Sequence, residues 1–225
     1  MGYKYETHLH TSQASACSHI TGAQAAEYYK SLGYTGIFVT DHFFNGNTCI
    51  PEMEDWNTRV SLFCEGYKDA FKRGKEIGLD VFFGLEFHYS GTHFLIYNLN
   101  EKWLCDHPEI MDIHPKDFLT FAKSEGALVV QAHPFREASY VKFMRLFPRD
   151  VDAVEYMNAS DTDDYRKMAK MYADHYGLPG FAGSDAHYTN NNALAGLEFE
   201  IPIKDEKHFA SLVKSGEYKL FFDEY

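Results

Sequence analysis

Histidine and carboxylate side chains recur at the ends of short apolar segments of this sequence. In the first segment, Lys4–His10, the side chains of an extended strand alternate between faces, so His8 and His10 point the same way and can chelate one cation. Later segments contribute further side chains of the same types. The candidate metal ligands are eight in all: His8, His10, His42, Glu86, His93, His133, Asp185 and His187.

The chemistry of these side chains narrows the choice of metal. Imidazole together with carboxylate favours Zn²⁺, Mn²⁺ or Fe²⁺, whereas Mg²⁺ and Ca²⁺ prefer oxygen ligands. One cation takes about four to six ligands, so eight predict two or three divalent ions. Glu86 and Asp185 are the natural bridging carboxylates. Two ions about 3.5–4 Å apart lower the pKa of a bridging water and hold both the attacking and the leaving oxygen of a displacement.

These residues also have a structural interpretation. The same side chains could form a polar network at the mouth of a barrel, although burying so many ionisable groups without a metal is costly. His93 has a core position as its alternative, and His88 competes with it as a ligand. Asp41 precedes His42 and is expected to point to the other face, as a structural or supporting group.

The order of the elements predicts how these side chains meet. Strand-like apolar runs alternate with helical patterns, with a helix expected at 138–147 and a final long strand from Leu197 to Ile203. Such alternation is typical of a mostly parallel sheet covered by helices, and about seven units suit a closed or nearly closed barrel. Active sites of such barrels lie at the carboxyl ends of the strands, where the candidate ligands fall. We expect residues 1–225 to form one domain.

Three loops are expected to determine the substrate: 11–22, 43–57 and 134–140. The second is long and is predicted to act as a lid or substrate loop. Its pair Phe43–Phe44 could stack on a substrate ring or merely anchor the loop.

Composition excludes some classes of function. The formal net charge is −12 at pH 7 and there is no basic run, which argues against a general nucleic-acid surface but allows a nucleotide in a local pocket. The four cysteines form neither a C-x-x-C zinc motif nor a dense disulfide framework. The sequence has no apolar signal core and no run of about 20 apolar residues. The cytoplasm is therefore the expected location, with no membrane partner.

Five motifs, taken in order, resemble the PHP (polymerase and histidinol phosphatase) superfamily: His8-x-His10, Thr40-Asp41-His42, Gly84-x-Glu86, His133-Pro134 and Gly183-Ser184-Asp185-Ala186-His187. The resemblance covers essentially the whole chain, and Ser-Asp-Ala-His after an apolar strand is its sharpest part. It implies an α/β fold, a distorted (β/α)7 TIM-like barrel, with a two- or three-metal centre. Free-standing members of this superfamily are mostly phosphoesterases.

The resemblance also implies how the ligands are shared. One metal would take His8, His10, Glu86 and Asp185; a second would share Glu86 and take His93 and His133; a third would take His42 and His187. The chain departs from the family pattern after the first motif. Where many relatives have Ser-Asp-Gly or a histidine that ligates the third metal, it reads Ser15-Ala16-Cys17-Ser18-His19. Cys17 or His19 is a candidate substitute.

The resulting hypothesis is metal-dependent hydrolysis of a small phosphomonoester, resembling histidinol phosphatase. A metal-bound hydroxide attacks phosphorus, Asp185 serves as a catalytic ligand, and His187 or His42 protonates the leaving alkoxide.

Two residues are candidate substrate contacts, Arg136 and His19. Arg136 follows His133 by three residues and suits a bidentate phosphate clamp, with a surface ion pair to Glu137 or Asp150 as the alternative. His19 is expected to face the substrate phosphate if it does not bind metal.

Other classes of function remain as alternatives. One is a phosphodiesterase or nuclease that acts on short substrates, and another is a phosphatase that acts on phosphotyrosine. A hydrolase of amides or lactams is less favoured, because such barrels often use a carbamylated lysine and no strand here ends in lysine. A non-catalytic, metal-binding regulatory module is also less favoured, because decayed sites usually lose ligands.

Overall fold

The computed structural model describes residues 2–224. Within that range the strands are β1 (Tyr3–Leu9), β2 (Gly36–Val39), β3 (Asp80–Tyr89), β4 (Thr92–Tyr97), β5 (Leu128–Ala132), β6 (Ala153–Asn158), β7 (Gly180–Gly183), β8 (Ala193–Phe199) and β9 (Lys219–Glu224). The helices are α1 (Gly22–Ser31), α2 (Trp56–Phe63), α3 (Glu65–Ile77), α4 (Glu101–Asp106), the 3-10 helix η1 (Pro108–Met111), α5 (Pro115–Ser124), α6 (Asp163–Tyr176) and α7 (Glu206–Ser215). Among these helices, none combines the length and the apolar character needed to cross a membrane.

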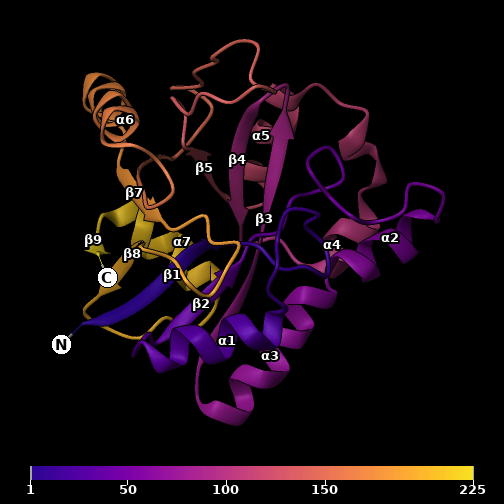
Figure 1. Ribbon diagram of the computed structural model, residues 1–225. Helices are drawn as coiled ribbons and strands as arrows, with labels where there is room; N and C mark the ends of the chain where they lie inside the picture. Colours follow the sequence, from indigo (N-terminus) through magenta and orange to yellow (C-terminus); the bar gives the residue numbers. More distant parts are fainter. Residues whose placement is uncertain (1, 225) are drawn as a thin grey trace.

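The strands form one sheet that curls into a nearly closed barrel (Figure 1). Strands β1 to β7 are neighbours in chain order, and β8 and β9 continue the sheet beyond β1. The chain just after β7 returns to the end of β1, where Leu9 and Ala186 form a parallel bridge and His10 N donates to the Ala186 oxygen at 2.9 Å. The expected distorted TIM-like barrel is confirmed, and this bridge is its seam.

Strand β4 runs against its neighbours. It pairs antiparallel with β3 and with β5, whereas β1–β2–β3 and β5–β6–β7 pair in parallel. Ser90 and Gly91 turn the chain between β3 and β4, and both have positive φ, 47° and 86°. His93 therefore lies near the start of β4, at the same rim as the carboxyl ends of the parallel strands. His93 is thus at the start of its strand, as the strand expected at 93–97 placed it, and not at a carboxyl end.

Helices α1 and α3 lie side by side outside the barrel (Figure 1). A capping box formed by Thr21 and Gln24 fixes the start of α1. A Cβ atom on Gly22 would lie 2.0 Å from the Gly66 carbonyl oxygen of α3, so this close approach of two backbones requires glycine. The contact holds the loop before α1 against the rim of the barrel.

The segment between β5 and β6 contains no helix, although one was expected at 138–147. The side chain of Gln131 binds its backbone instead: Gln131 Nε2 donates to the Arg145 oxygen at 2.7 Å, and Phe147 N donates to Gln131 Oε1 at 3.1 Å. These bonds replace part of a helical ladder. Some apolar side chains of this segment lie at the protein surface, and Phe143 is 66% exposed.

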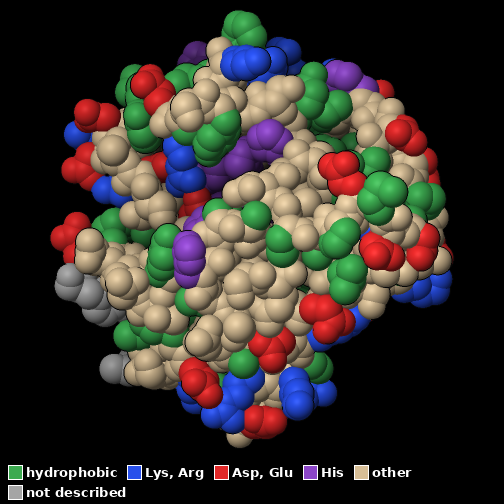
Figure 2. All heavy atoms as spheres, turned by 45° about the vertical axis from the view of Figure 1, so that its right-hand side comes forward, with side chains coloured by type: hydrophobic (Ala, Val, Ile, Leu, Met, Phe, Trp, Pro, Cys, Tyr) green, Lys and Arg blue, Asp and Glu red, His purple; other side chains and the backbone are tan. Residues whose placement is uncertain are grey.

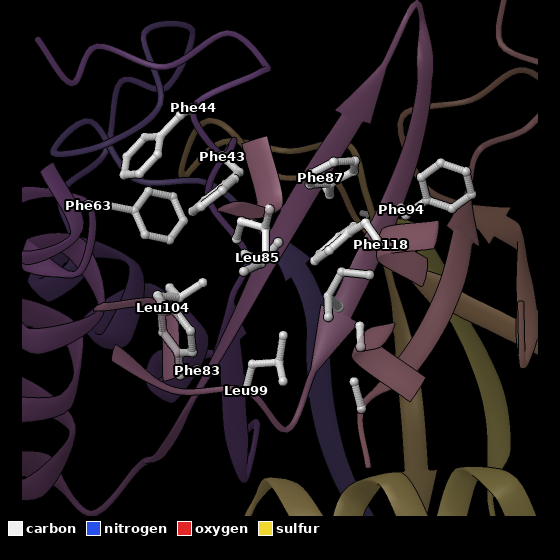
Figure 3. Packing of buried hydrophobic residues seen from close by; sticks show 14 of the residues in the cluster. Phe43, Phe44, Phe63, Phe83, Leu85, Phe87, Phe94, Leu99, Leu104 and Phe118 are labelled. Carbon is white, nitrogen blue, oxygen red and sulfur yellow. The ribbon is translucent and has the colours of Figure 1, made fainter. Parts of the chain in front are cut away.

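The aromatic pair of the 43–57 loop anchors it to the core. The rings of Phe43 and Phe44 stack with centroids 4.3 Å apart, and both rings pack against Phe63 of α2 (Figure 3). Phe43 is fully buried. The pair is therefore unavailable to stack on a substrate.

Strand β8 lies earlier than expected, at Ala193–Phe199 and not at 197–203. It pairs antiparallel with β1 on one side and with β9 on the other. Pro202 has no N–H group to donate to a sheet, which is consistent with the strand ending before it.

Candidate metal centre

All eight candidate ligands meet at one rim of the barrel. Strands β1, β3 and β4 carry His8, Glu86 and His93, and segments that follow strands carry the other five. Their ligand atoms lie within 4.8 Å of one another in four overlapping groups: His10–His42–His187, His8–Glu86–His133, His8–His10–Asp185 and His42–Glu86–His93. Seven of the eight residues are buried, and His187 is partly buried.

Glu86 is the centre of this cluster. Its Oε1 lies 2.8 Å from His93 Nδ1 and 3.2 Å from His133 Nε2, and its Oε2 lies 2.5 Å from His42 Nδ1. Burial favours the neutral acid, but the nearby imidazoles of His93 and His42 outweigh burial and hold the pKa of Glu86 well below its usual range. An ionised carboxylate among imidazoles has the surroundings expected of a bridging ligand.

Asp185 faces the same cluster from the other side. Its Oδ1 lies 3.1 Å from His10 Nε2 and 3.5 Å from His8 Nε2. Burial favours its neutral form, but Arg136 and then His8 hold the pKa of Asp185 well below its usual range. The rim therefore holds two buried carboxylates, both ionised at neutral pH.

Arg136 lies against Asp185 in a partly buried position. Its Nε donates to Asp161 at 2.6 Å, and its Nη1 donates to Asp185 Oδ2. The alternative drawn from the sequence, an ion pair with Glu137 or Asp150, is wrong. Arg136 is tied to the candidate centre itself.

Several polar atoms of the cluster are buried without a well-formed hydrogen bond in the protein. His93 Nε2 has no hydrogen-bond partner, and His42 Nδ1 and Glu86 Oε2 face each other in an ion pair, at 2.5 Å. In addition, His8 Nε2 and His10 Nε2 face each other at 3.2 Å. Buried polar atoms are costly unless something binds them. The residues present therefore fit divalent cations that prefer nitrogen and carboxylate ligands.

Glu155, which the sequence analysis did not single out, orients two of the histidines. Its Oε1 lies 2.9 Å from His8 Nδ1, and its Oε2 accepts from His133 N at 3.2 Å. A carboxylate on one ring nitrogen leaves the other nitrogen free for a metal. The sequence signal was a glutamate inside the otherwise apolar run of β6.

Glu6, also overlooked, joins β1 to the chain after β7. Its Oε1 accepts from the backbone N–H groups of Thr7, His8 and Ser184, at 3.0, 2.9 and 2.9 Å. Its Oε2 accepts from the Tyr29 hydroxyl at 2.8 Å. Glu6 thus holds the two segments that carry His8 and Asp185 in register.

Asp41 has the supporting position expected from the sequence. Ser15 Oγ donates to Asp41 Oδ1 at 2.6 Å and lies 3.2 Å from His10 Nδ1. Because the Ser15 hydroxyl hydrogen is used by Asp41, its oxygen is left to accept from the His10 ring. This arrangement directs His10 Nε2 to the cluster.

Two candidate ligands have a strained backbone. His133 and Asp185 have φ angles of 26° and 53°, in a region that residues other than glycine rarely adopt. Such strain persists only where the surroundings enforce it, and it gathers at functional sites.

A pocket of about 530 Å³ opens onto the cluster, and Figure 2 shows histidine side chains in a hollow of the surface. Its lining includes several candidate ligands and the side chains of Cys17, Arg136 and Tyr140. His19 is exposed, stacks on Tyr188 at 4.7 Å and lines a different hollow. The geometry therefore does not support the substrate contact expected of His19, and Cys17 occupies the pocket.

Cation binding by these histidines depends on their protonation state. Burial lowers the pKa of His42, but the Glu86 carboxylate outweighs burial and raises this pKa to about 10. Glu155 and Asp185 likewise outweigh burial and raise the pKa of His8 well above its usual value. Both imidazoles are protonated at pH 7 in the metal-free protein and must lose a proton before they bind a cation.

We therefore expect Zn²⁺ loading at pH 7 to release about two protons per chain. The folded pKa of His42 is raised, so its ion pair stabilises the metal-free protein fully below pH 6.5, and this stabilisation is lost as the pH rises through about 10. Calorimetric titration in buffers of different ionisation heat counts the protons. Thermal unfolding of chelator-treated protein should give a Tm that falls above pH 6.5. A constant Tm with no proton release would contradict this account.

A family model described as PHP-associated matches residues 164–218, which run from α6 to just past α7 and include Asp185 and His187. No curated protein sequence matches the chain.

Solved structures share the fold. A two-domain Bacteroides vulgatus protein that contains a predicted PHP-like metal-dependent phosphoesterase aligns with a TM-score of 0.71 and 14% identity over 98% of this chain and 65% of its own. The lesion-specific endonuclease PfuEndoQ from Pyrococcus furiosus aligns with a TM-score of 0.67 and 18% identity over 98% and 58% of the two chains. A candidate metal-dependent phosphoesterase from Bifidobacterium adolescentis aligns with a TM-score of 0.53 and 16% identity over 82% and 88%.

This chain thus spans less than two thirds of the length of the first two proteins. At such identities the likeness shows the fold. Together with the family model, it confirms the resemblance to the PHP superfamily that the motifs indicated.

Proposed function

We propose that this chain, which has the fold of PHP-like metal-dependent phosphoesterases, hydrolyses small phosphomonoesters with two or three divalent cations of the Zn²⁺, Mn²⁺ or Fe²⁺ type. The observation that supports this most directly is the convergence of imidazoles on two buried, ionised carboxylates beneath an open pocket. The proposed ligand sets are those that the resemblance implies: His8, His10, Glu86 and Asp185; Glu86, His93 and His133; and His42 and His187.

Arg136 is proposed to act on both the centre and the substrate. Such cations, when bound, activate water and offset charge on the phosphoryl oxygens. Arg136 keeps Asp185 ionised and uses three of its five N–H groups on Asp161, Asp185 and Asn158. The remaining two can bind a phosphoryl oxygen at the pocket wall.

In the two-cation form of the centre, in which its Nε2 binds no metal, His187 is the proposed proton donor to the leaving alkoxide. Its side chain is 20% exposed, against 9% for His42, so it lies nearer the mouth of the pocket. Its Nδ1 lies 2.9 Å from the Asp185 backbone oxygen, which fixes the ring. Burial lowers its pKa, but Cys17 and Asp185 outweigh burial and raise this pKa above the usual histidine value, which favours the protonated ring.

The free cysteines and the negative net charge of the chain fit a small substrate in a reducing compartment. The four cysteines form no disulfide, in keeping with the proposed cytoplasmic location. The net charge of −12 disfavours long nucleic acids. The endonuclease among the structural neighbours nevertheless makes phosphodiester cleavage of short substrates the second candidate.

Phosphate release from a panel of phosphomonoesters, with Mn²⁺ or Zn²⁺ present, tests the proposal, beside a phosphodiester series. We expect turnover that requires metal and falls on the order of 10³-fold in Asp185→Asn. Arg136→Lys, which keeps the charge but loses the fork, should lower kcat/KM by about 10–100-fold. Turnover of diesters alone would change the proposed function to that of a phosphodiesterase. If the metal-loaded protein turned over neither monoesters nor diesters, the proposed phosphoesterase function would be overturned.

A further inference from the structure

The loop after β1 holds one thiol in a fixed position at the rim. Ala16 N donates to the Asn47 oxygen at 2.9 Å, and Ser18 Oγ donates to the His10 oxygen at 2.9 Å. Cys17 lies between these two anchors and is partly buried. These bonds hold the backbone on both sides of Cys17 in place.

The thiol faces one candidate ligand directly and shares a pocket with a second. Cys17 Sγ lies 3.1 Å from His187 Nε2. The side chains of Cys17, His187 and His42 line the same pocket.

A second observation at this place points independently to a cation. His10, His42 and His187 form a group of imidazoles whose ligand atoms lie within 4.8 Å of one another. His42 is 7% exposed, and its Nδ1 lies 2.5 Å from Glu86 Oε2. Three imidazoles beside a thiol make a set of nitrogen and sulfur donors, whereas the rest of the centre is built from nitrogen and oxygen.

We propose that Cys17 is a thiolate ligand of the cation held by His42 and His187, and that this outermost site selects a thiophilic ion, Zn²⁺ or Fe²⁺, over Mn²⁺ or Mg²⁺. Thiolate is a soft ligand that favours these ions, whereas carboxylate favours harder ones. The proposal rests on the cation centre of the proposed function and assigns the ligand of one of its sites.

The competing residue, His19, does not reach this site. It is exposed and stacked on Tyr188, and it lines a separate hollow. Its backbone N–H donates to the His187 oxygen at 3.0 Å, so the segment approaches His187 through its backbone and not through the imidazole.

Substitution of the full-length protein with Co²⁺ tests the proposal without an activity assay. A cobalt–thiolate bond gives a near-ultraviolet charge-transfer band that nitrogen and oxygen ligands do not give. We expect this band in the wild type, at least tenfold weaker in Cys17→Ser, and weakened likewise in His187→Asn. Cys49→Ser removes an exposed thiol on a neighbouring segment and should leave the band unchanged, as should His19→Asn.

A second variant separates ligand loss from misfolding. Cys17→Asp offers a carboxylate in place of the thiolate, so it should lose the band but hold at least as much metal as the wild type when loaded with Mn²⁺. A band that survives in Cys17→Ser, or that is absent from the cobalt-loaded wild type, would overturn the proposal. Phosphate release measured on the same samples reports separately on the proposed function, since hydrolysis without the band leaves that function standing.

Discussion

Replacing Glu86 by glutamine should lower kcat/KM for phosphomonoesters on the order of 10³-fold or more and remove at least one metal ion per chain. Glu86 contacts imidazoles through both oxygens, at 2.8 Å from His93 and 2.5 Å from His42. An amide of the same shape offers one acceptor in place of two and carries no charge. Metal content by elemental analysis and steady-state kinetics on the same preparation give the two readings together.

The loss should be specific to the position and charge of this carboxylate. Glu86→Asp keeps the charge at a shorter reach and should retain part of both metal content and activity. Glu52→Gln, on an exposed loop position, serves as the matched control and should behave as the wild type. In the metal-free protein the Glu86→Gln change also breaks a buried ion pair, which costs about 3–5 kcal/mol of unfolding free energy. If Glu86→Gln kept the wild-type metal content and activity within tenfold, Glu86 would not be a ligand.

The second large effect is expected on the stability of the protein when Glu6 is replaced by leucine. This change should lower the free energy of unfolding of the metal-free protein by about 3–5 kcal/mol, because three buried N–H groups and the hydroxyls of Tyr29 and Ser184 lose Glu6 as their acceptor. Urea unfolding in the presence of a chelator, followed by circular dichroism, measures it.

Glu6→Gln distinguishes the lost hydrogen bonds from a mere change of packing. Glutamine keeps one oxygen for the three N–H groups, so it should lose about 1–2 kcal/mol. The Glu6 side chain lies away from the pocket, and once folded and loaded with metal the glutamine variant should turn over substrate within a few-fold of wild type. A Glu6→Leu protein within 1 kcal/mol of wild type would show that other contacts hold the seam.

Local patterns predicted which candidate ligands would lie close together for a simple reason. Alternation along one strand places His8 and His10 on one face whatever the rest of the chain does. The barrel itself followed from the order of its strands and helices. The antiparallel direction of β4 could also be predicted from the sequence. Only the Ser90–Gly91 turn separates β4 from β3, and so short a connection joins antiparallel strands.

The features that the sequence did not reveal depend on contacts between distant segments. Glu155 acts on His8 from a strand 147 residues away, and nothing around it in the sequence indicates that partner. The choice between Cys17 and His19 depends on how the loop pairs with the 43–57 segment, through the Ser15–Thr48 bridge. The absent helix at 138–147 shows the same limit, since the backbone at its end bonds to the buried side chain of Gln131 in another element.

The seam between β1 and the chain after β7 has a consequence for how the protein folds. The Glu6–Ser184 contact joins residues 178 positions apart, and closing so long a loop costs chain entropy before any contact repays it. Contacts of this separation are expected to form late, after the local helices and the β3–β4 hairpin. A chain still emerging from the ribosome has the His8-x-His10 pair long before it has Asp185. If the proposed centre binds cations, its full affinity is therefore expected only when the last turn of the barrel is in place, and metal capture would then be a marker of completed folding.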